Sequence, residues 1–322
     1  MKRLWAIGAA IAVVAAGFVA WRLVGDTVVP LLRADDCEAT VQGRTVTLAP
    51  EQAENAALIA AISVERGMPA RAATIALATA YQESKLYNIE FGDRDSLGLF
   101  QQRPSQGWGT PEQLLDPGYA THAFYDALTA VDDYEGLDVT VAAQEVQRSA
   151  YPDAYADHEA DARVLASALT GQSFRAFHCT VTDEPDEASM ELDDAGLTER
   201  ADVVRRDLES VFGPQSLGGF APGGVRDGHM PGSAHYDGRA VDVFVRPISE
   251  VNKERGWAIA QYLVAQAARL EVRTVIFDNR IWTSGLRSAD GWRSFDPDTS
   301  GRDADTAAIL EHRDHVHVDV YP

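Results

Sequence analysis

Residues 233–242 read SAHYDGRAVD, and this stretch decides how the C-terminal part of the chain folds. It runs into RAVDVFV at 239–245, where valines alternate with other residues. This two-residue period predicts a β-strand with Asp242 on the face opposite the valines. The C-terminal stretch HVHVDV at 315–320 has the same period and predicts a second strand. Its other face carries His315, His317 and Asp319.

The polar faces of these two strands favour a metal site. Burying two histidines and an aspartate costs free energy unless a metal or hydrogen bonds satisfy them. A catalytic zinc ion takes three protein ligands and leaves a fourth position for water, whose proton a nearby carboxylate or imidazole accepts. We therefore expect zinc ligands at His235, Asp242 and His317. Either Asp314 or His315 is expected to act as the base, and a structural metal, or none, is the alternative.

The motif in residues 233–242 fits S-x-H-x-x-G-x-A-x-D at every specified position. It resembles the signature of a zinc peptidase group that contains D-Ala-D-Ala carboxypeptidases, lysostaphin-type endopeptidases and the hedgehog signalling domain. This resemblance covers residues 197–322 and implies an α+β fold and hydrolysis of peptide bonds in the stem peptides of peptidoglycan. It implies the same three zinc ligands: His235, Asp242 and His317.

The resemblance leaves two candidates for the base. The carboxypeptidase branch places an acidic base three residues before the last ligand, which is Asp314 here. The lysostaphin branch uses the first histidine of an H-x-H pair, which is His315. The group also has an arginine that holds the substrate carboxylate or the developing oxyanion. The corresponding residue is Arg226, nine residues before His235.

Residues 80–104, AYQESKLYNIEFGDRDSLGLFQQRP, contain a second candidate site. Glu83 is predicted near the end of an apolar helix. A carboxyl group there, beside aromatic residues, can have the raised pKa that a general acid for glycosidic cleavage requires. A solvated glutamate is the alternative. The pattern E-S … S-x-G-L-x-Q resembles that of lysozyme-like lytic transglycosylases and goose-type lysozymes, over residues 50–172.

The second resemblance implies an all-α lysozyme-like fold in which Glu83 is the acid and base of glycan cleavage. Aromatic faces and amides suit sugar rings, so we expect a saccharide groove lined by Ser96, Gln101 and Trp108. Ordinary packing is the alternative for Trp108. The downstream A-Y-N-x-G motif of that family is absent, and AAQEVQRSAYPDAY occupies its place.

The N-terminus predicts a membrane anchor at 1–25. Two basic residues precede an uncharged run, Leu4–Trp21, which is close to the length of about 20 residues that spans a bilayer. The basic residues place the N-terminus inside and the rest of the chain outside the cytoplasm, and a cleaved signal peptide is the alternative. Outside the cytoplasm thiols pair, so we expect a disulfide between Cys37 and Cys179.

The amino-acid composition limits the classes of protein and partner that remain possible. The chain of 322 residues is 46% hydrophobic and 24% charged, which is typical of a globular protein with a core. Its net charge of -21 argues against a nucleic-acid partner, because phosphate contacts need clusters of lysine and arginine. After the anchor we expect three parts: a lysozyme-like domain (37–179), an acidic linker (180–196) and a zinc peptidase domain (197–322).

The sequence thus predicts an α+β multidomain protein that is anchored in the cell membrane by a single span. Its expected function is hydrolysis of extracytoplasmic peptidoglycan, by glutamate-dependent glycan cleavage and zinc-dependent cleavage of stem peptides. A catalytically inactive wall-binding or metal-binding protein with the same folds is the alternative.

Overall fold

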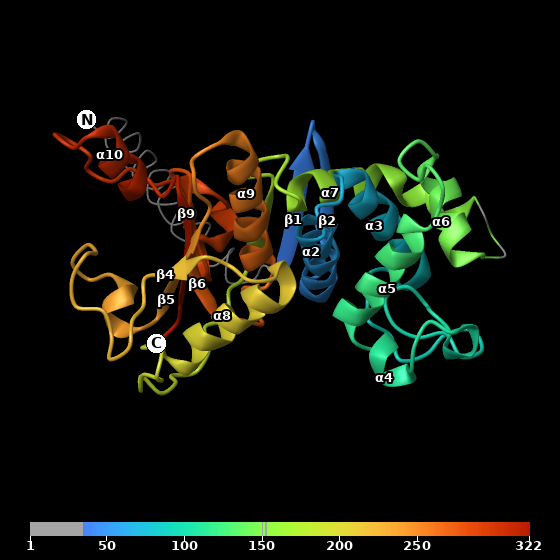
Figure 1. Ribbon diagram of the computed structural model, residues 1–322, viewed down its shortest axis with the longest axis horizontal. Helices are drawn as coiled ribbons and strands as arrows, with labels where there is room; N and C mark the ends of the chain where they lie inside the picture. Colours follow the sequence, from blue (N-terminus) through green and yellow to red (C-terminus); the bar gives the residue numbers. More distant parts are fainter. Residues whose placement is uncertain (1–34, 150, 152) are drawn as a thin grey trace, which may run out of the picture. The chain divides into compact units, whose positions relative to one another are not determined.

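The computed structural model describes residues 35–149, 151 and 153–322 (Figure 1). The predicted anchor at 1–25 lies outside this part of the chain. Among the described helices, none has both the length and the apolar character needed to cross a bilayer. Residues Asp36–Pro322 form one compact unit of the α+β class, with a helical N-terminal region and a C-terminal antiparallel sheet.

A three-stranded antiparallel sheet, in the order β2-β1-β3, joins the two ends of the N-terminal region. Its strands are β1 (Asp36–Val41), β2 (Arg44–Leu48) and β3 (Phe177–Thr180). In the register of β1 and β3, Cys37 lies opposite Cys179, and the two form a disulfide. The predicted pairing of the cysteines is therefore confirmed.

The chain between β2 and β3 forms helices, most of which contact α3, whose mostly small side chains are buried on almost all sides. They are α2 (Pro50–Glu65), α3 (Ala70–Ser84), η1 (Pro104–Gln106), α4 (Pro111–Leu114), α5 (Pro117–Thr129), α6 (Val139–Gln147), η2 (Ala154–His158) and α7 (Glu159–Leu169). The first of these begins at a proline, which the first helical turn tolerates because its N–H would have no partner there. α3 ends at Lys85 in the left-handed conformation, so Glu83 lies in its last turn.

The C-terminal region is built on a six-stranded antiparallel sheet in the order β4-β5-β9-β6-β7-β8. The strands are β4 (Leu217–Gly218), β5 (Ala240–Phe244), β6 (Val272–Phe277), β7 (Arg280–Thr283), β8 (Arg293–Ser294) and β9 (His315–Val320). The other elements are α8 (Glu199–Phe212), η3 (Ala234–Asp237), α9 (Glu250–Ala265), η4 (Gly285–Asp290) and α10 (Ala304–Leu310). α9 packs on β6 and β9, and the valines of β5 and β9 are buried, as their alternation predicts.

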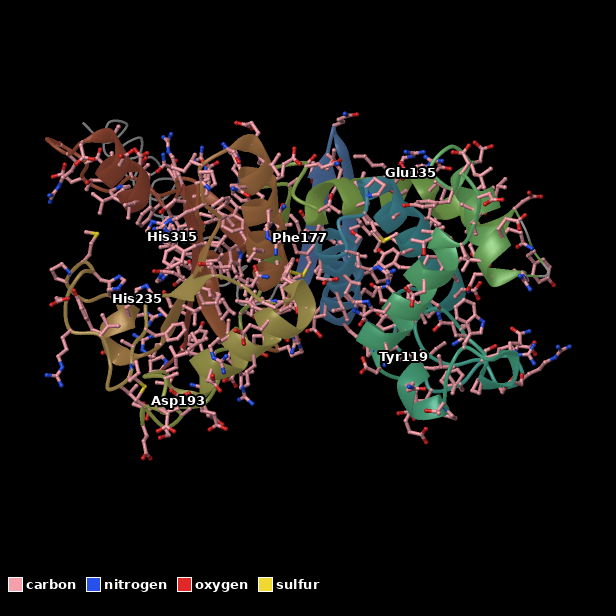
Figure 2. All side chains as sticks on the ribbon, viewed as in Figure 1. Tyr119, Glu135, Phe177, Asp193, His235 and His315 are labelled. Carbon is pink, nitrogen blue, oxygen red and sulfur yellow. A yellow bond between two sulfur atoms is a disulfide. The ribbon has the colours of Figure 1, made fainter. Side chains whose placement is uncertain are left out.

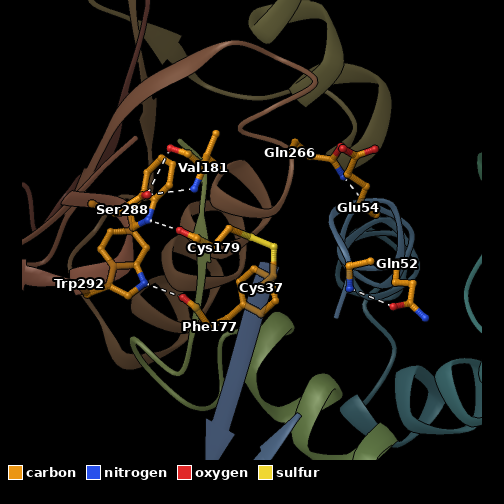
Figure 3. Close-up of a disulfide and its surroundings, with 11 residues drawn as sticks. Cys37, Gln52, Glu54, Phe177, Cys179, Val181, Gln266, Ser288 and Trp292 are labelled. Atoms are coloured by element: carbon orange, nitrogen blue, oxygen red, sulfur yellow. Dashed lines mark hydrogen bonds between the residues drawn. A yellow bond between two sulfur atoms is a disulfide. The ribbon is translucent and has the colours of Figure 1, made fainter. Parts of the chain in front are cut away.

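Side chains of the C-terminal region hydrogen-bond to β3, the strand that carries the disulfide. The indole of Trp292 donates to the carbonyl of Phe177 at 2.8 Å (Figure 3). The indole of Trp282 donates to the carbonyl of Cys179 at 3.1 Å. Gln261 accepts from the N–H of Phe177 at 2.9 Å. Residues 181–198 have no helix or strand and include the predicted linker (180–196) except its first residue, Thr180, which is the last residue of β3. The predicted domain boundaries stay a prediction.

Candidate functional site

The pairing of β5 with β9 brings the predicted ligands together. Asp242 lies directly opposite His317 in the register of the two strands, and Phe244 lies opposite His315. His235 comes from the short helix η3, where the Ser233 hydroxyl accepts a hydrogen bond from its N–H at 3.4 Å. Figure 2 shows His235 and His315 on these neighbouring elements.

Three ligand atoms form a small triangle. His235 Nε2 lies 3.0 Å from His317 Nδ1 and 3.2 Å from Asp242 Oδ1, and the last two atoms are 3.1 Å apart. All three side chains are buried. Ligand atoms about 2.0–2.1 Å from a tetrahedral zinc ion lie about 3.3 Å from one another. The triangle therefore has nearly the dimensions of a zinc ligand set.

In His235 and His317, the ring nitrogen that is not part of the triangle contacts an oxygen atom. His235 Nδ1 lies 2.7 Å from the carbonyl of Gly219, which only accepts, so this nitrogen carries the proton. His317 Nε2 lies 3.3 Å from Asp319 Oδ2 and donates in the same way. The two nitrogens of the triangle, His235 Nε2 and His317 Nδ1, then have lone pairs that face Asp242. Three lone pairs this close repel one another unless a cation lies between them.

The pKa values of His317 and Asp242 follow from these contacts. Burial alone lowers the pKa of His317, but hydrogen bonds to Asp242 and Asp319 outweigh it and raise the pKa to about 9. Burial alone would raise the pKa of Asp242, but its contacts with His235 and His317 hold it well below its ordinary value. The pocket thus favours positive charge next to an ionised carboxylate.

His229, which no sequence pattern singled out, also belongs to this cluster. Its ring stacks on that of His235 with 4.0 Å between centroids and an angle of 24°. His229, His235 and Asp242 each offer a ligand atom, and these atoms lie within 4.8 Å of one another, so the three could hold a metal ion. The Tyr236 hydroxyl fixes His229, since it donates to the carbonyl at 2.6 Å and accepts from the N–H at 3.1 Å.

The two candidate bases lie side by side and contact each other. His315 Nδ1 is 2.7 Å from Asp314 Oδ1, while His315 Nε2 is 3.8 Å from Asp242 Oδ1. Burial raises the pKa of Asp314, but hydrogen bonds from His315 and Arg246 outweigh it and lower the pKa below its ordinary value. The imidazole therefore faces the ligand cluster, and the carboxylate lies behind it.

A further histidine, His312, packs beside this pair, with 4.6 Å between its ring centroid and that of His315. Burial and the neighbouring imidazoles lower the pKa of His312 to about 3, so its ring is neutral at pH 7. Arg226 is exposed, and the structure records no hydrogen bond or ion pair between it and any described residue of the cluster. Its predicted role as the substrate-binding arginine stays a prediction.

Glu83 lies in a second, separate site in the helical region. Its Oε1 accepts a hydrogen bond from the Tyr155 hydroxyl at 2.7 Å, and its carboxylate also contacts Gln147. Burial outweighs both hydrogen bonds and raises the pKa of Glu83. Ser84 ties the helix end to the following loop through a 2.7 Å hydrogen bond to the Leu99 carbonyl. The raised pKa is the one predicted for a general acid.

A cleft of about 880 Å³ is lined by Trp108 and by Gln147, the residue that contacts Glu83. The other two residues predicted to bind substrate have structural contacts. Ser96 is buried, and Gln101 donates to the carbonyls of Gly98 and Phe91 within its own loop. Substrate binding by these three residues stays a prediction.

Comparisons with known proteins cover only part of the chain. A family model described as VldE, C-terminal domain, matches residues 193–308, which is less than half of the chain. The match includes His229, His235 and Asp242 and ends before β9. A search of curated proteins finds no match.

Proposed function

We propose that this chain is an extracytoplasmic peptidoglycan hydrolase with two active sites. One is a zinc peptidase site at His235, Asp242 and His317, and the other is a glycan-cleaving site at Glu83. The observation that carries the proposal is the triangle of buried ligand atoms, about 3 Å on each side, beside an imidazole that is oriented by a carboxylate.

The third ligand in this proposal is His317 rather than His229. An imidazole binds a metal through a lone pair in the plane of its ring. Because the rings of His229 and His235 are nearly parallel and stacked, the lone pairs of His229 run alongside those of His235 instead of converging with them. Zinc in such a site acts as a Lewis acid and makes a water molecule more acidic.

The base in this proposal is His315, which corresponds to the lysostaphin-type alternative. Asp314 Oδ1 accepts the Nδ1 proton of His315, so the Nε2 lone pair is free to accept a proton from the attacking water. The neutral imidazole of His312 would lie beside this base. The substrate would be a stem peptide of peptidoglycan.

The features of the N-terminal site also agree with peptidoglycan as the substrate. A partly buried glutamate with a raised pKa can hold the proton that the leaving sugar oxygen requires. Tyr155 and Gln147 keep its carboxylate in place beside the cleft. The disulfide is typical of proteins outside the cytoplasm, which agrees with the predicted anchor and location.

Product analysis of digested cell walls tests the proposal. Wild-type protein should contain about one zinc ion per chain and release both glycan and peptide cleavage products. We expect Glu83→Gln to lose only the glycan products and His317→Ala to lose zinc and only the peptide products. His122→Ala, which removes an exposed histidine, serves as the control. If the zinc-loaded wild type released nothing, the chain would be a wall-binding or metal-binding protein instead.

A further inference from the structure

The guanidinium of Arg246 is fixed at the edge of the C-terminal site. Its Nε donates to Asp314 Oδ2 at 2.7 Å, and its Nη2 lies 2.6 Å from the same oxygen. Its central carbon lies 4.1 Å from the centroid of the Phe244 ring. The N–H of Val245 donates to the Asp314 carbonyl at 2.9 Å. Side-chain and backbone contacts therefore join the end of β5 to the start of β9.

Both carboxylate oxygens of Asp314 accept hydrogen bonds. Oδ2 contacts Arg246, and Oδ1 accepts from His315 Nδ1 at 2.7 Å. The aspartate is only 5% exposed, and burying an ionised carboxylate without partners is unfavourable. Arg246 supplies the compensating charge on one side, which leaves the other oxygen for the imidazole.

His315 is held in one orientation and one tautomer by this arrangement. A carboxylate only accepts hydrogen bonds, so His315 Nδ1 carries the proton and Nε2 keeps its lone pair. Nε2 lies 3.8 Å from Asp242 Oδ1, so it faces the proposed ligand triangle. The other neutral tautomer would present a protonated Nε2 to the site instead.

We propose that Arg246 is a positioning residue that acts through Asp314 to fix the ring and the tautomer of His315. The inference rests on the proposed function, in which His315 is the base. Without the guanidinium, Asp314 Oδ2 is a buried anion with no partner. The carboxylate then has to turn toward solvent, and it loses its hold on His315.

A direct role of Arg246 in substrate binding is the competing explanation. A cleft of about 580 Å³ lies beside the site, and Arg246 and Asp314 line it together with the partly exposed side chains of Ile248 and Ile309. A positioning role lowers kcat and leaves KM little changed, whereas lost substrate binding raises KM. The two roles are therefore separable by experiment.

The test compares Arg246→Gln, Arg246→Lys and Arg313→Gln in the full zinc-loaded chain. Arg313 also precedes β9 and is adjacent to Asp314, but its guanidinium contacts Glu311 at 2.7 Å, so it controls for the lost charge. Nitrogen NMR of the histidine rings reports the tautomer of His315, metal analysis reports zinc, and cleavage of purified stem peptides reports kcat and KM.

We expect Arg246→Gln to keep one zinc per chain, to give a mixture of His315 tautomers and to lose about 10–100-fold in kcat, as outer-shell substitutions do. Arg246→Lys should recover part of the loss, and Arg313→Gln should match the wild type. The inference is overturned if Arg246→Gln keeps a single tautomer, or if only KM changes. If the wild type cleaved no peptide, the proposed function would fail, while the tautomer measurement would still decide the role of Arg246.

Discussion

Replacing Gly219 with alanine should disable the C-terminal site without unfolding the protein. Gly219 has φ +79°, and a Cβ added there would lie 2.2 Å from His235 Cε1 and 2.9 Å from Asp242 Oδ2. Ordinary contacts begin at 3.4 Å, so the His235 ring would have to move by about 1 Å. That movement breaks the 2.7 Å hydrogen bond to the Gly219 carbonyl and opens the ligand triangle.

The expected loss of zinc affinity is at least about 10–100-fold, the usual effect of removing an outer-shell partner. Metal–ligand distances tolerate only about 0.2 Å, which is much less than the required shift of the ring. The left-handed backbone adds a separate cost of about 1 kcal/mol to the folding of any alanine variant at this position.

Two glycines of the same loop provide matched controls. Gly223 and Gly232 also have φ +79°, and a Cβ at either would have no neighbour within 4 Å. Competitive zinc titration against a chelator, together with thermal unfolding, separates the two effects. All three variants should lose the stability that the left-handed backbone costs, Gly219→Ala should lose more because of its clash, and only Gly219→Ala should lose zinc. Equal zinc affinity in all three would refute the reasoning.

Three further predictions concern the charge of Glu83, the binding of zinc and the disulfide. Glu83 has its pKa raised by burial, so the stability it contributes is present below the unfolded pKa of about 4.3 and is lost as the pH rises through the folded value. Calorimetry should therefore give Glu83→Gln a higher Tm than wild type at pH 7 and an equal one near pH 3; a lower Tm at pH 7 would contradict this. Zinc at 100 times its Kd should stabilise the wild type by about 2.7 kcal/mol and leave His235→Ala unchanged in thermal unfolding, and an equal shift in both would place the metal elsewhere. The disulfide spans 142 residues, so urea unfolding of a Cys37→Ser, Cys179→Ser double variant should show a loss of roughly 4–5 kcal/mol, and an unchanged midpoint would contradict the entropic argument.

The sequence predicted the C-terminal strands well because strand periodicity is a local property. In β5 and β9 the two-residue period assigns each side chain to a face before the register is known, so Asp242 and His317 could be placed on matching faces. The cysteine pair was predictable for a different reason, since two thiols outside the cytoplasm have only one intramolecular partner each.

The sequence did not predict the partners of these residues, because they come from distant parts of the chain. Tyr155 lies 72 residues from Glu83, and Arg246 lies 68 residues from Asp314. His229 belongs to a glycine-rich loop without helical or strand periodicity, so no pattern indicated that its ring stacks on His235. Such contacts depend on how loops and strand ends pack, and that is decided by the whole fold.

The pKa values of Glu83 and Asp242 are shifted in opposite directions, and the difference follows from their partners. Glu83 is held by a hydroxyl and an amide, which carry no charge, so burial decides and its pKa rises. Asp242 is held by two imidazoles whose other ring nitrogens contact oxygen atoms, so positive charge is favoured beside it and its pKa falls. A carboxyl group that keeps its proton suits acid catalysis, and one that loses its proton readily suits a metal ligand. The two proposed chemistries therefore require the same residue type in two environments, and each environment is supplied by side chains far away in the sequence.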